Sequence, residues 1–343
     1  MTVRTGKLPE SALTRSVLKQ VHTGNNRISH PFQKNVFENT KGAAIGSDCA
    51  FFAASNEQVL AWCAQEAAVA MQADAGAALV QKCVNNLACA GAMPASAQIS
   101  IMLPESCEEA QVKALMTELS KACMEHGIQI AGGDTNVTSA VNQPIVTITV
   151  VGVTSKGELH DLSMAKAGQD LVLTKWIGLE GTAILAKNYR EKLLARYPAF
   201  LVDEAAGFDQ FLPVEKEAKI AAANGAAAMH DLSQGGVFGA LWELAEGAGL
   251  GLSVNLKKIP VRQETIEVCE VCGVNPYEMR SGGSLLVTAE DGEKVANALE
   301  AEGIHAVVIG KLTEWSDRII LNEEEVRYLD RPKGADSIAE IIA

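Results

Sequence analysis

The chain has 343 residues, of which 48% are hydrophobic, and a formal net charge of −13 at pH 7. This length predicts about two domains, and the composition is that of a globular protein with a sizeable core. Such a negative charge argues against nucleic acid and against an anionic membrane as partners. It does not exclude ATP, because phosphate sites are local and are often built from backbone N–H groups.

Cysteine usage and the first residues of the chain point to the cell interior. The chain has 8 cysteines, and its opening residues lack the apolar segment of a secretory signal. No apolar run approaches the roughly 18 residues that are needed to cross a membrane. We therefore expect a cytoplasmic protein in which most thiols act as small buried apolar groups.

Hydrophobic periodicity predicts a mixture of helices and strands in the first half of the chain. The clearest helix covers 105–126, and Gly127 is placed to end it. A polar stretch at 23–41 is expected to be a loop. The remaining expected elements are helices at 10–21 and 73–90 and strands at 59–63, 99–103, 128–131 and 145–153.

Strands and helices alternate in the second half, which is typical of an α/β domain. A polar segment at 156–167 marks the expected boundary, so we place an α+β domain at 1–155 and an α/β domain at 168–343. The expected strands of the second half are 171–174, 252–256, 284–288 and 306–309, and its expected helices are 181–187, 215–224, 237–248, 265–272 and 292–301.

The segment 132–135, Gly-Gly-Asp-Thr, is the most informative short motif. We expect it to follow a strand directly, where two glycines let the backbone pass close to a ligand. Asp134 and Thr135 then offer oxygen atoms of the kind that Mg²⁺ binds together with phosphates and water. The alternative is a Gly-Gly turn in which Asp134 only bonds the local backbone.

A second acidic turn, Gly46-Ser47-Asp48, follows an apolar run. An aspartate in a turn is most often structural, because its side chain bonds nearby backbone groups. Asp48 gains interest from Asp134, since two carboxylates that meet in space would form a site for a divalent cation.

The segment 229–236 joins an expected strand to an expected helix through polar residues and glycines. Such a junction exposes N–H groups at the start of a helix, where phosphate or carboxylate can bind. Alternatively, Asp231 or Ser233 caps the helix. His230 is a candidate acid–base group, although a single histidine is more often structural.

Lys175 comes after the strand at 171–174 and just before a Gly-rich turn. It is a candidate phosphate ligand, and the alternative is a solvated surface lysine.

Cys269 and Cys272 form a Cys-x-x-Cys pair, but no second pair accompanies them, which argues against zinc. We expect Cys269 and Ile266 to share the inner face of a helix, as core residues rather than as a redox centre.

Together these segments resemble the AIR synthase-related (PurM/HypE-like) superfamily, and the resemblance covers nearly the whole chain. Each motif alone is modest, but seven in the family's order are highly specific. The matching motifs are Gly6-Lys7-Leu8-Pro9, Gly46-Ser47-Asp48-Cys49-Ala50, Asn85-Asn86-Leu87-Ala88 with Gly91-Ala92 and Pro94, Gly132-Gly133-Asp134-Thr135, Thr174-Lys175 with Glu180-Gly181-Thr182, His230-Asp231 with Gly235-Gly236, and Ser281-Gly282.

The resemblance implies a PurM-like fold with an N-terminal domain that pairs with its copy in a homodimer. It also implies ATP and Mg²⁺ as cofactors and a small-molecule substrate whose oxygen atom is phosphorylated. Such catalysis consists mainly of positioning and charge neutralisation. By this resemblance Asp48 and Asp134 are expected metal ligands, Asp134, Lys175 and His230 are expected catalytic residues, and the expected nucleotide and phosphate contacts are Asn85, Asn86, Gly132, Gly133, Asp134, Thr135, Asp231, Gly235 and Gly236.

The chain departs from the family pattern at two expected metal ligands. Asn86 stands where the family has aspartate, and Cys63 lies where another aspartate is expected, with Glu66 or Asp74 as possible replacements. Fewer carboxylates should weaken Mg²⁺ binding, although the carbonyl oxygen of asparagine still offers a ligand. The given chain ends in Ile-Ile-Ala, whereas hydrogenase maturation factors of this type end in cysteine, so we expect a different reaction.

Three functions stay open on this reasoning. The first is an enzyme that transfers a phosphoryl group from ATP to an oxygen of an unidentified small substrate. The second is a ligand-binding or regulatory protein that kept the fold and lost catalysis, as the changes at Asn86 and Cys63 suggest. The third, suggested by the cysteine count, is a redox- or metal-responsive protein.

Overall fold

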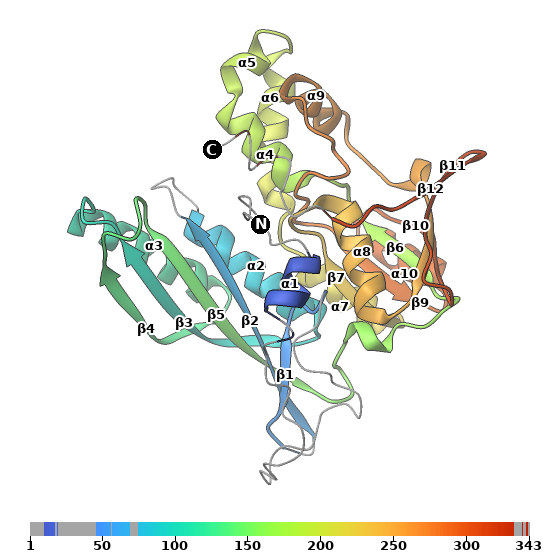
Figure 1. Cartoon of the computed structure of the whole chain (residues 1–343), viewed down its shortest axis with the longest axis horizontal. Coiled ribbons are helices and arrows are strands. Elements are labelled where there is room, and N and C mark those ends of the chain that lie inside the picture. Colours follow the sequence, from blue (N-terminus) through green and yellow to red (C-terminus); the bar gives the residue numbers. More distant parts are fainter. Residues whose placement is uncertain are drawn as a thin grey trace. The chain divides into compact units, whose positions relative to one another are not determined.

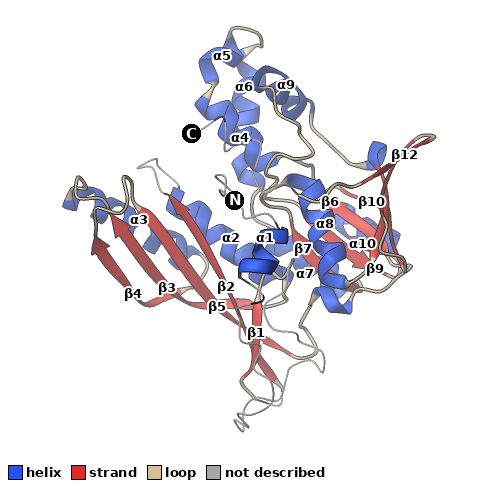
Figure 2. Cartoon of the chain, in the orientation of Figure 1, coloured by secondary structure: helices blue, strands red, loops and turns tan. Residues whose placement is uncertain are grey.

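The computed structural model describes residues 10–17, 19, 46–55, 57–68, 75–332, 338 and 341. The chain divides into two compact units, each with its own sheet and core (Figures 1 and 2). The N-terminal unit holds 28–40 and 48–159, and the C-terminal unit holds 1–27, 41–47 and 160–343.

Some expected features fall outside the described residues. These are the motif at 6–9, the polar loop at 23–41 and Asp74. In the part of the chain that is described, no helix combines the length and the apolar character that crossing a bilayer requires. The first described helix, α1 (Glu10–Ser16), belongs to the C-terminal unit and ends earlier than the expected helix at 10–21.

The N-terminal unit is a five-stranded sheet in the order β1-β2-β5-β3-β4. Three of its neighbouring pairs are antiparallel, and β3 and β4 run parallel. Two helices, α2 and α3, pack against one face of this sheet (Figure 1). The elements are β1 (Ala50–Ala53), β2 (Gln58–Ala68), α2 (Ala75–Cys89), β3 (Met93–Leu103), α3 (Glu109–Glu125), β4 (Gln129–Val137) and β5 (Ile145–Ser155).

The central strand β5 explains how the sequence builds this sheet. Alternate residues of a strand point to opposite faces. Val146, Ile148 and Val150 are fully buried in the core beneath the helices. Thr147 and Thr149, between them, lie half-buried on the other face.

The face of the sheet opposite α2 and α3 is called here the open face, because no helix of the N-terminal unit covers it among the described residues. This face carries apolar side chains, mainly toward the β1 side of the sheet. On β3, Met102 is 43% exposed and Met93 is 75% exposed. The half-buried apolar residues of the open face are Phe52, Leu60, Trp62, Ile145, Val151 and Val153.

The C-terminal unit is built on a seven-stranded sheet in the order β12-β11-β8-β10-β6-β9-β7. Among the described strands of this sheet, only β8 and β11 pair in parallel, so the α/β domain has a mixed and mainly antiparallel sheet. Its strands are β6 (Asp170–Thr174), β7 (Ala226–Asp231), β8 (Gly251–Asn255), β9 (Leu285–Ala289), β10 (Ala306–Thr313), β11 (Arg318–Asn322) and β12 (Glu325–Tyr328).

Helices cover both faces of the seven-stranded sheet (Figure 2). Leu171 and Leu173 of β6 join the core under α8 (Gly236–Ala248). Val172, between them, faces α10 (Gly292–Ala301), which contacts α7 (Glu215–Ala223).

Four helices form a separate small core in this unit. They bury Leu185, Leu193, Val202 and Val268 around Met279. Two of these helices, and the hairpin of β11 and β12, were not expected from the sequence. The four helices are α4 (Leu179–Asn188), α5 (Arg190–Leu194), α6 (Ala199–Ala206) and α9 (Gln263–Cys272).

Candidate functional site

Asp48 lies half-buried just before β1, beside the end of α2. The Nδ2 group of Asn86 donates a hydrogen bond of 3.4 Å to the backbone oxygen of Asp48. Asn86 is 5% exposed and sits in the last turn and a half of α2, so its amide is held in a fixed place. The N-terminal unit therefore holds the side-chain amide of Asn86 against the backbone of Asp48.

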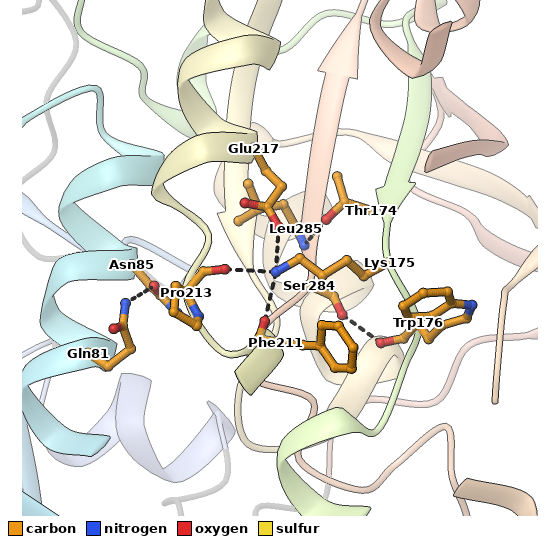
Figure 3. A network of polar contacts seen from close by, with 10 residues as sticks. All are labelled: Gln81, Asn85, Thr174, Lys175, Trp176, Phe211, Pro213, Glu217, Ser284 and Leu285. Carbon is orange, nitrogen blue, oxygen red and sulfur yellow. Dashed lines mark hydrogen bonds and ion pairs between the residues drawn. The ribbon is translucent and has the colours of Figure 1, made fainter. Parts of the chain in front are cut away.

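Asn85 occupies the preceding position of α2 and is 2% exposed. Its Oδ1 accepts a hydrogen bond of 2.9 Å from Nε2 of Gln81, one helical turn earlier (Figure 3). This bond fixes the orientation of the Asn85 amide.

Asp134 lies inside the edge strand β4, which corrects the expectation that the strand ends before the glycines. The strand continues to Val137, and Asp134 is exposed. Its Oδ1 accepts a hydrogen bond of 2.9 Å from the backbone N–H of Thr135, and its Oδ2 accepts one of 2.6 Å from Nδ2 of Asn136. The alternative of a Gly-Gly turn is wrong, because these residues belong to a strand paired with β3, but its expectation that Asp134 bonds the local backbone is confirmed.

Gly133 has a structural reason to be glycine. Its φ of +151° is rarely adopted by residues with a side chain, and an added Cβ would lie 1.7 Å from the backbone oxygen of Ile99. Gly132 is different, because nothing lies within 4 Å of an added Cβ there. Only the second glycine is thus required for the pairing of β4 with β3.

Asp48 and Asp134 do not meet within one chain. Asp48 precedes β1 and Asp134 lies on β4, which are the two edges of the five-stranded sheet. Four strand spacings of about 4.8 Å separate these edges, or roughly 19 Å, whereas Mg²⁺ holds its oxygen ligands at about 2.1 Å. The expectation that one chain brings both carboxylates to a single ion is therefore corrected by the order of the strands.

Cys63, which replaces an expected aspartate, points into the core and not toward solvent. It is 3% exposed on β2, and its S–H group donates a hydrogen bond of 3.4 Å to the backbone oxygen of Cys83. Glu66, considered as a replacement ligand, is exposed farther along β2. The position of Cys63 therefore offers no carboxylate to a metal ion.

In the C-terminal unit, His230 and Asp231 end β7 and are almost fully buried. A ring nitrogen of His230 and a carboxylate oxygen of Asp231 lie within 4.8 Å of each other. Nε2 of His230 lies 3.5 Å from Oε2 of Glu243, on α8. The histidine thus has two carboxylates nearby, an arrangement suited to holding or moving a proton.

Helix α8 begins at Gly236, with Gly235 as the N-cap and no side-chain cap, so the expectation that Asp231 or Ser233 caps it is wrong. Gly236 touches the next segment so closely that a Cβ would lie 2.5 Å from the backbone oxygen of Tyr277. Its N–H group already bonds the oxygen of Ser233. The two glycines therefore shape this junction, with Gly235 at φ +89° and Gly236 at φ +63°.

Lys175 is buried, so the alternative of a solvated surface lysine is wrong. Figure 3 shows its Nζ paired with Glu217 and donating hydrogen bonds of 2.7 Å to the backbone oxygens of Phe211 and Pro213. Burial lowers the pKa of the Lys175 ammonium, and Glu217 opposes that shift. With three acceptors around one ammonium group, Lys175 serves the fold of this unit and is poorly placed to bind phosphate.

The Cys-x-x-Cys pair is part of the helical core, as expected. Cys269 is 3% exposed and packs in the core around Met279, and Cys272 packs against it. Burial raises the pKa of the Cys269 thiol to about 12, which makes it a poor nucleophile. Ile266 does not share this face, since it is 41% exposed, and Thr265 and Val268 take the inner positions instead.

Two residues that the sequence reasoning missed complete these arrangements. Glu243 faces His230 from α8, and Glu217 neutralises Lys175 from the first turn of α7. Both are ordinary-looking acidic residues on amphipathic helices, and no motif or spacing in the sequence marks them.

The chain matches two domain families in succession. Residues 46–154 match AIR synthase related protein, N-terminal domain, and residues 166–322 match AIR synthase related protein, C-terminal domain. Carbamoyl dehydratase HypE of Rhodobacter capsulatus is 31% identical over 245 residues, which cover 69% of each chain.

Two solved structures share the fold. A hydrogenase maturation protein HypE in complex with ATP has a TM-score of 0.66 at 20% identity, over 79% of this chain and 84% of that chain. The protein AaThiL complexed with AMPPCP and TMP has a TM-score of 0.65 at 20% identity, over 84% of this chain and 92% of that chain. The two domain matches span most of the sequence, and the chain therefore belongs to the AIR synthase-related protein family.

Proposed function

We propose that this protein is an enzyme that uses ATP and Mg²⁺ to phosphorylate an oxygen atom of a small substrate. The observation that carries the proposal is the pairing of Asp48 with the buried amide of Asn86, next to Asn85, in the domain that matches the family. Of two solved structures with the same fold, one is a complex with ATP and the other a complex with AMPPCP and TMP.

The donor atoms suit the proposed cofactors. Carboxylate and carboxamide oxygens are hard ligands of the kind that Mg²⁺ prefers, and phosphate oxygens and water would complete its coordination. When bound, the ion would neutralise charge on the phosphoryl group that is transferred. Asp48 and Asp134 would hold the metal, and Asn85, Asn86, Gly132, Gly133 and Thr135 would line the nucleotide site.

A homodimer would solve the separation of the two aspartates. Consider two copies whose open faces pack together around a twofold axis that runs parallel to the strands. This operation places β1 of one copy over β4 of the other, with the sheets about 10 Å apart. Asp48 would then lie near Asp134 of the partner subunit, and each dimer would contain two such sites.

The apolar residues of the open face support this arrangement. Phe52, Leu60, Trp62 and Val151 gather on a sheet face that no described helix of the unit covers. An apolar sheet face is expected to be covered in the functional state. We therefore propose that the N-terminal units form the dimer.

On the C-terminal unit, we propose that His230 and Asp231 bind the acceptor substrate. His230 would take the proton from the acceptor oxygen as that oxygen attacks the phosphoryl group. Glu243 would stabilise the protonated ring from 3.5 Å. Gly235 and Gly236 let the chain turn closely after Asp231. Lys175 takes no part in phosphate binding in this proposal, because Glu217 pairs with its ammonium group.

The second candidate is a regulatory or ligand-binding member of the family that works without turnover. The burial of Cys63 in the core favours it, because that position offers no carboxylate to a metal. The two candidates differ in one measurable respect. An enzyme hydrolyses or transfers the γ-phosphate of ATP when its substrate is present, whereas a regulatory protein binds without turnover.

Titration calorimetry of Mg²⁺ and ATP into the full chain tests the proposal. We expect binding that requires Mg²⁺ and that weakens at least tenfold in Asp48→Asn. The absence of heat at millimolar ATP would refute nucleotide binding. We further propose that the protein works in the cytoplasm, without nucleic acid or membrane as a partner, in keeping with its charge of −13.

A further inference from the structure

Two cysteines stand opposite each other where β1 meets β2. Ala50 of β1 pairs with Trp62 of β2 in antiparallel register. Cys49 comes one residue before Ala50 and Cys63 one residue after Trp62, so the same register places Cys49 opposite Cys63. Directly opposed residues of antiparallel strands have Cα atoms about 4.5–5.5 Å apart, within the roughly 4.4–6.8 Å that a disulfide requires. The two thiols are also close enough that each shifts the pKa of the other.

The environment of the pair is apolar and enclosed. Cys49 is 6% exposed and Cys63 is 3% exposed, and both belong to the core beneath α2. The S–H group of Cys49 donates a hydrogen bond of 3.4 Å to the backbone oxygen of Asn86. Opposed side chains share a face, so the sulfur atoms need little movement to reach bonding distance.

The other buried cysteines of this unit provide an internal comparison. Cys83 and Cys89 lie on the same helix, α2, six positions apart. Six residues of α-helix rise about 9 Å, which is too far for a disulfide between them. Helix geometry thus excludes a disulfide between these two cysteines of α2.

We propose that Cys49 and Cys63 form a reversible disulfide. With hydrogen peroxide as the oxidant, one S–S bond forms while two S–H bonds and the O–O bond of the peroxide break. Two electrons and two protons pass from the thiols to the peroxide, which leaves as two molecules of water. A dithiol reductant returns both cysteines to thiols and is itself oxidised to a disulfide.

Local opening of β1 would give small oxidants a route to the pair. Strand β1 has only four residues and lies at the edge of the sheet, with a partner on one side only. Short edge strands open locally at low cost, because few hydrogen bonds have to break.

The disulfide would act on the residues around Asp48. Cys49 directly follows Asp48, so the new bond would tie that position to β2. It would also remove the S–H donor to the oxygen of Asn86, the residue whose amide holds the Asp48 carbonyl. Oxidation would therefore change the affinity for Mg²⁺ and ATP, a consequence that rests on the proposed function.

Peptide mapping of the full-length protein tests the disulfide. After peroxide treatment and alkylation of the remaining thiols, a Glu-specific protease places Cys49 in peptide 39–57, Cys63 in 58–66, and Cys83 with Cys89 in 67–105. We expect a crosslink between the first two peptides that dithiothreitol removes. It should be lost in Cys49→Ala and Cys63→Ala and retained in Cys83→Ala.

The wild-type protein alone decides the outcome, so poor folding of a variant does not obscure it. Recovery of Cys49 and Cys63 as alkylated thiols, under conditions that oxidise the half-exposed Cys107, would overturn the proposal, and so would a crosslink from either to 67–105. Titration of Mg²⁺ and ATP into oxidised protein and into reduced protein distinguishes a failure of the proposed disulfide from a failure of the proposed function. Failure of the reduced protein to bind refutes the proposed function but leaves the disulfide standing.

Discussion

Asp48 and Asp134 stand at opposite edges of one five-stranded sheet, with β2, β5 and β3 between them. A single chain can therefore give a metal ion only one of the two carboxylates. The apolar open face lies between them and supplies a reason for a second chain to bind. The proposed site thus depends on dimerisation as much as on its own residues.

Replacing Trp62 with aspartate should separate the proposed dimer. Trp62 is half-buried on the open face, and a carboxylate there would have to lose its hydration when two faces pack. We expect dimerisation to weaken by on the order of 100-fold. Light scattering after size-exclusion chromatography measures the mass.

Met124→Asp is the matched control, because Met124 is 72% exposed on α3, on the helical side of the same unit. It should leave the mass unchanged. A Trp62→Asp protein that keeps the mass of the wild-type dimer, or a wild type that is monomeric, would contradict the dimer model.

Gly133→Ala should destabilise the N-terminal unit, whereas Gly132→Ala should not. An added methyl group at Gly133 would meet the oxygen of Ile99 at 1.7 Å on a backbone with positive φ. We expect a loss of at least about 2 kcal/mol in the free energy of unfolding, against less than about 0.5 kcal/mol for Gly132→Ala. Urea denaturation measures both, and equal effects would argue against the described pairing of β4 with β3.

Lys175→Met should destabilise the C-terminal unit by leaving Glu217 buried without its cation. Breaking a buried pair on one side typically costs about 3–5 kcal/mol. The matched control is Lys187→Met, since Lys187 and Asp209 pair 2.6 Å apart with about half of each side chain exposed. Such surface pairs contribute about 0–1 kcal/mol. Similar losses for both variants in chemical denaturation would count against the buried role of Lys175.

His160 should make stability fall at acidic pH. Burial lowers the pKa of its imidazole below 6.5, although its Nδ1 donates a hydrogen bond of 3.2 Å to the backbone oxygen of Ala227, which opposes that shift. The unfolded chain then binds a proton more readily than the folded chain, so stability is full above about pH 6.5 and declines as pH falls below it. Thermal unfolding between pH 5 and 8 should show a smaller acid loss in His160→Gln than in wild type. An unchanged pH profile would show that His160 is not responsible.

The strands and helices with strong periodicity were predictable from the sequence. The run of β-branched residues at 145–153 identified β5, and the apolar face of 105–126 identified α3. The family was also predictable, because its motifs recur in a fixed order along the chain. Local patterns carry this information without any knowledge of tertiary contacts.

What the sequence could not provide was the order of strands in space. Asp48 and Asp134 each sit in a recognisable motif, yet only the order of the five strands shows that they lie at opposite edges. Likewise, the sequence allowed Lys175 to be a phosphate ligand or a surface lysine, because nothing near it in the sequence indicates its buried partner Glu217, 42 residues later on α7. The sequence around a charged residue on an amphipathic helix does not show which residue it pairs with.

Mixing two variants tests the central claim most directly. Asp48→Asn and Asp134→Asn homodimers should each bind ATP with Mg²⁺ poorly, because every site lacks one carboxylate. After subunit exchange, about half of the dimers contain one subunit of each variant, and one of the two sites in each mixed dimer is intact. About a quarter of the wild-type number of sites should therefore return. Calorimetry that shows this partial recovery supports a site shared between subunits. Full ATP binding by either variant alone, or no recovery on mixing while wild type binds, would contradict it.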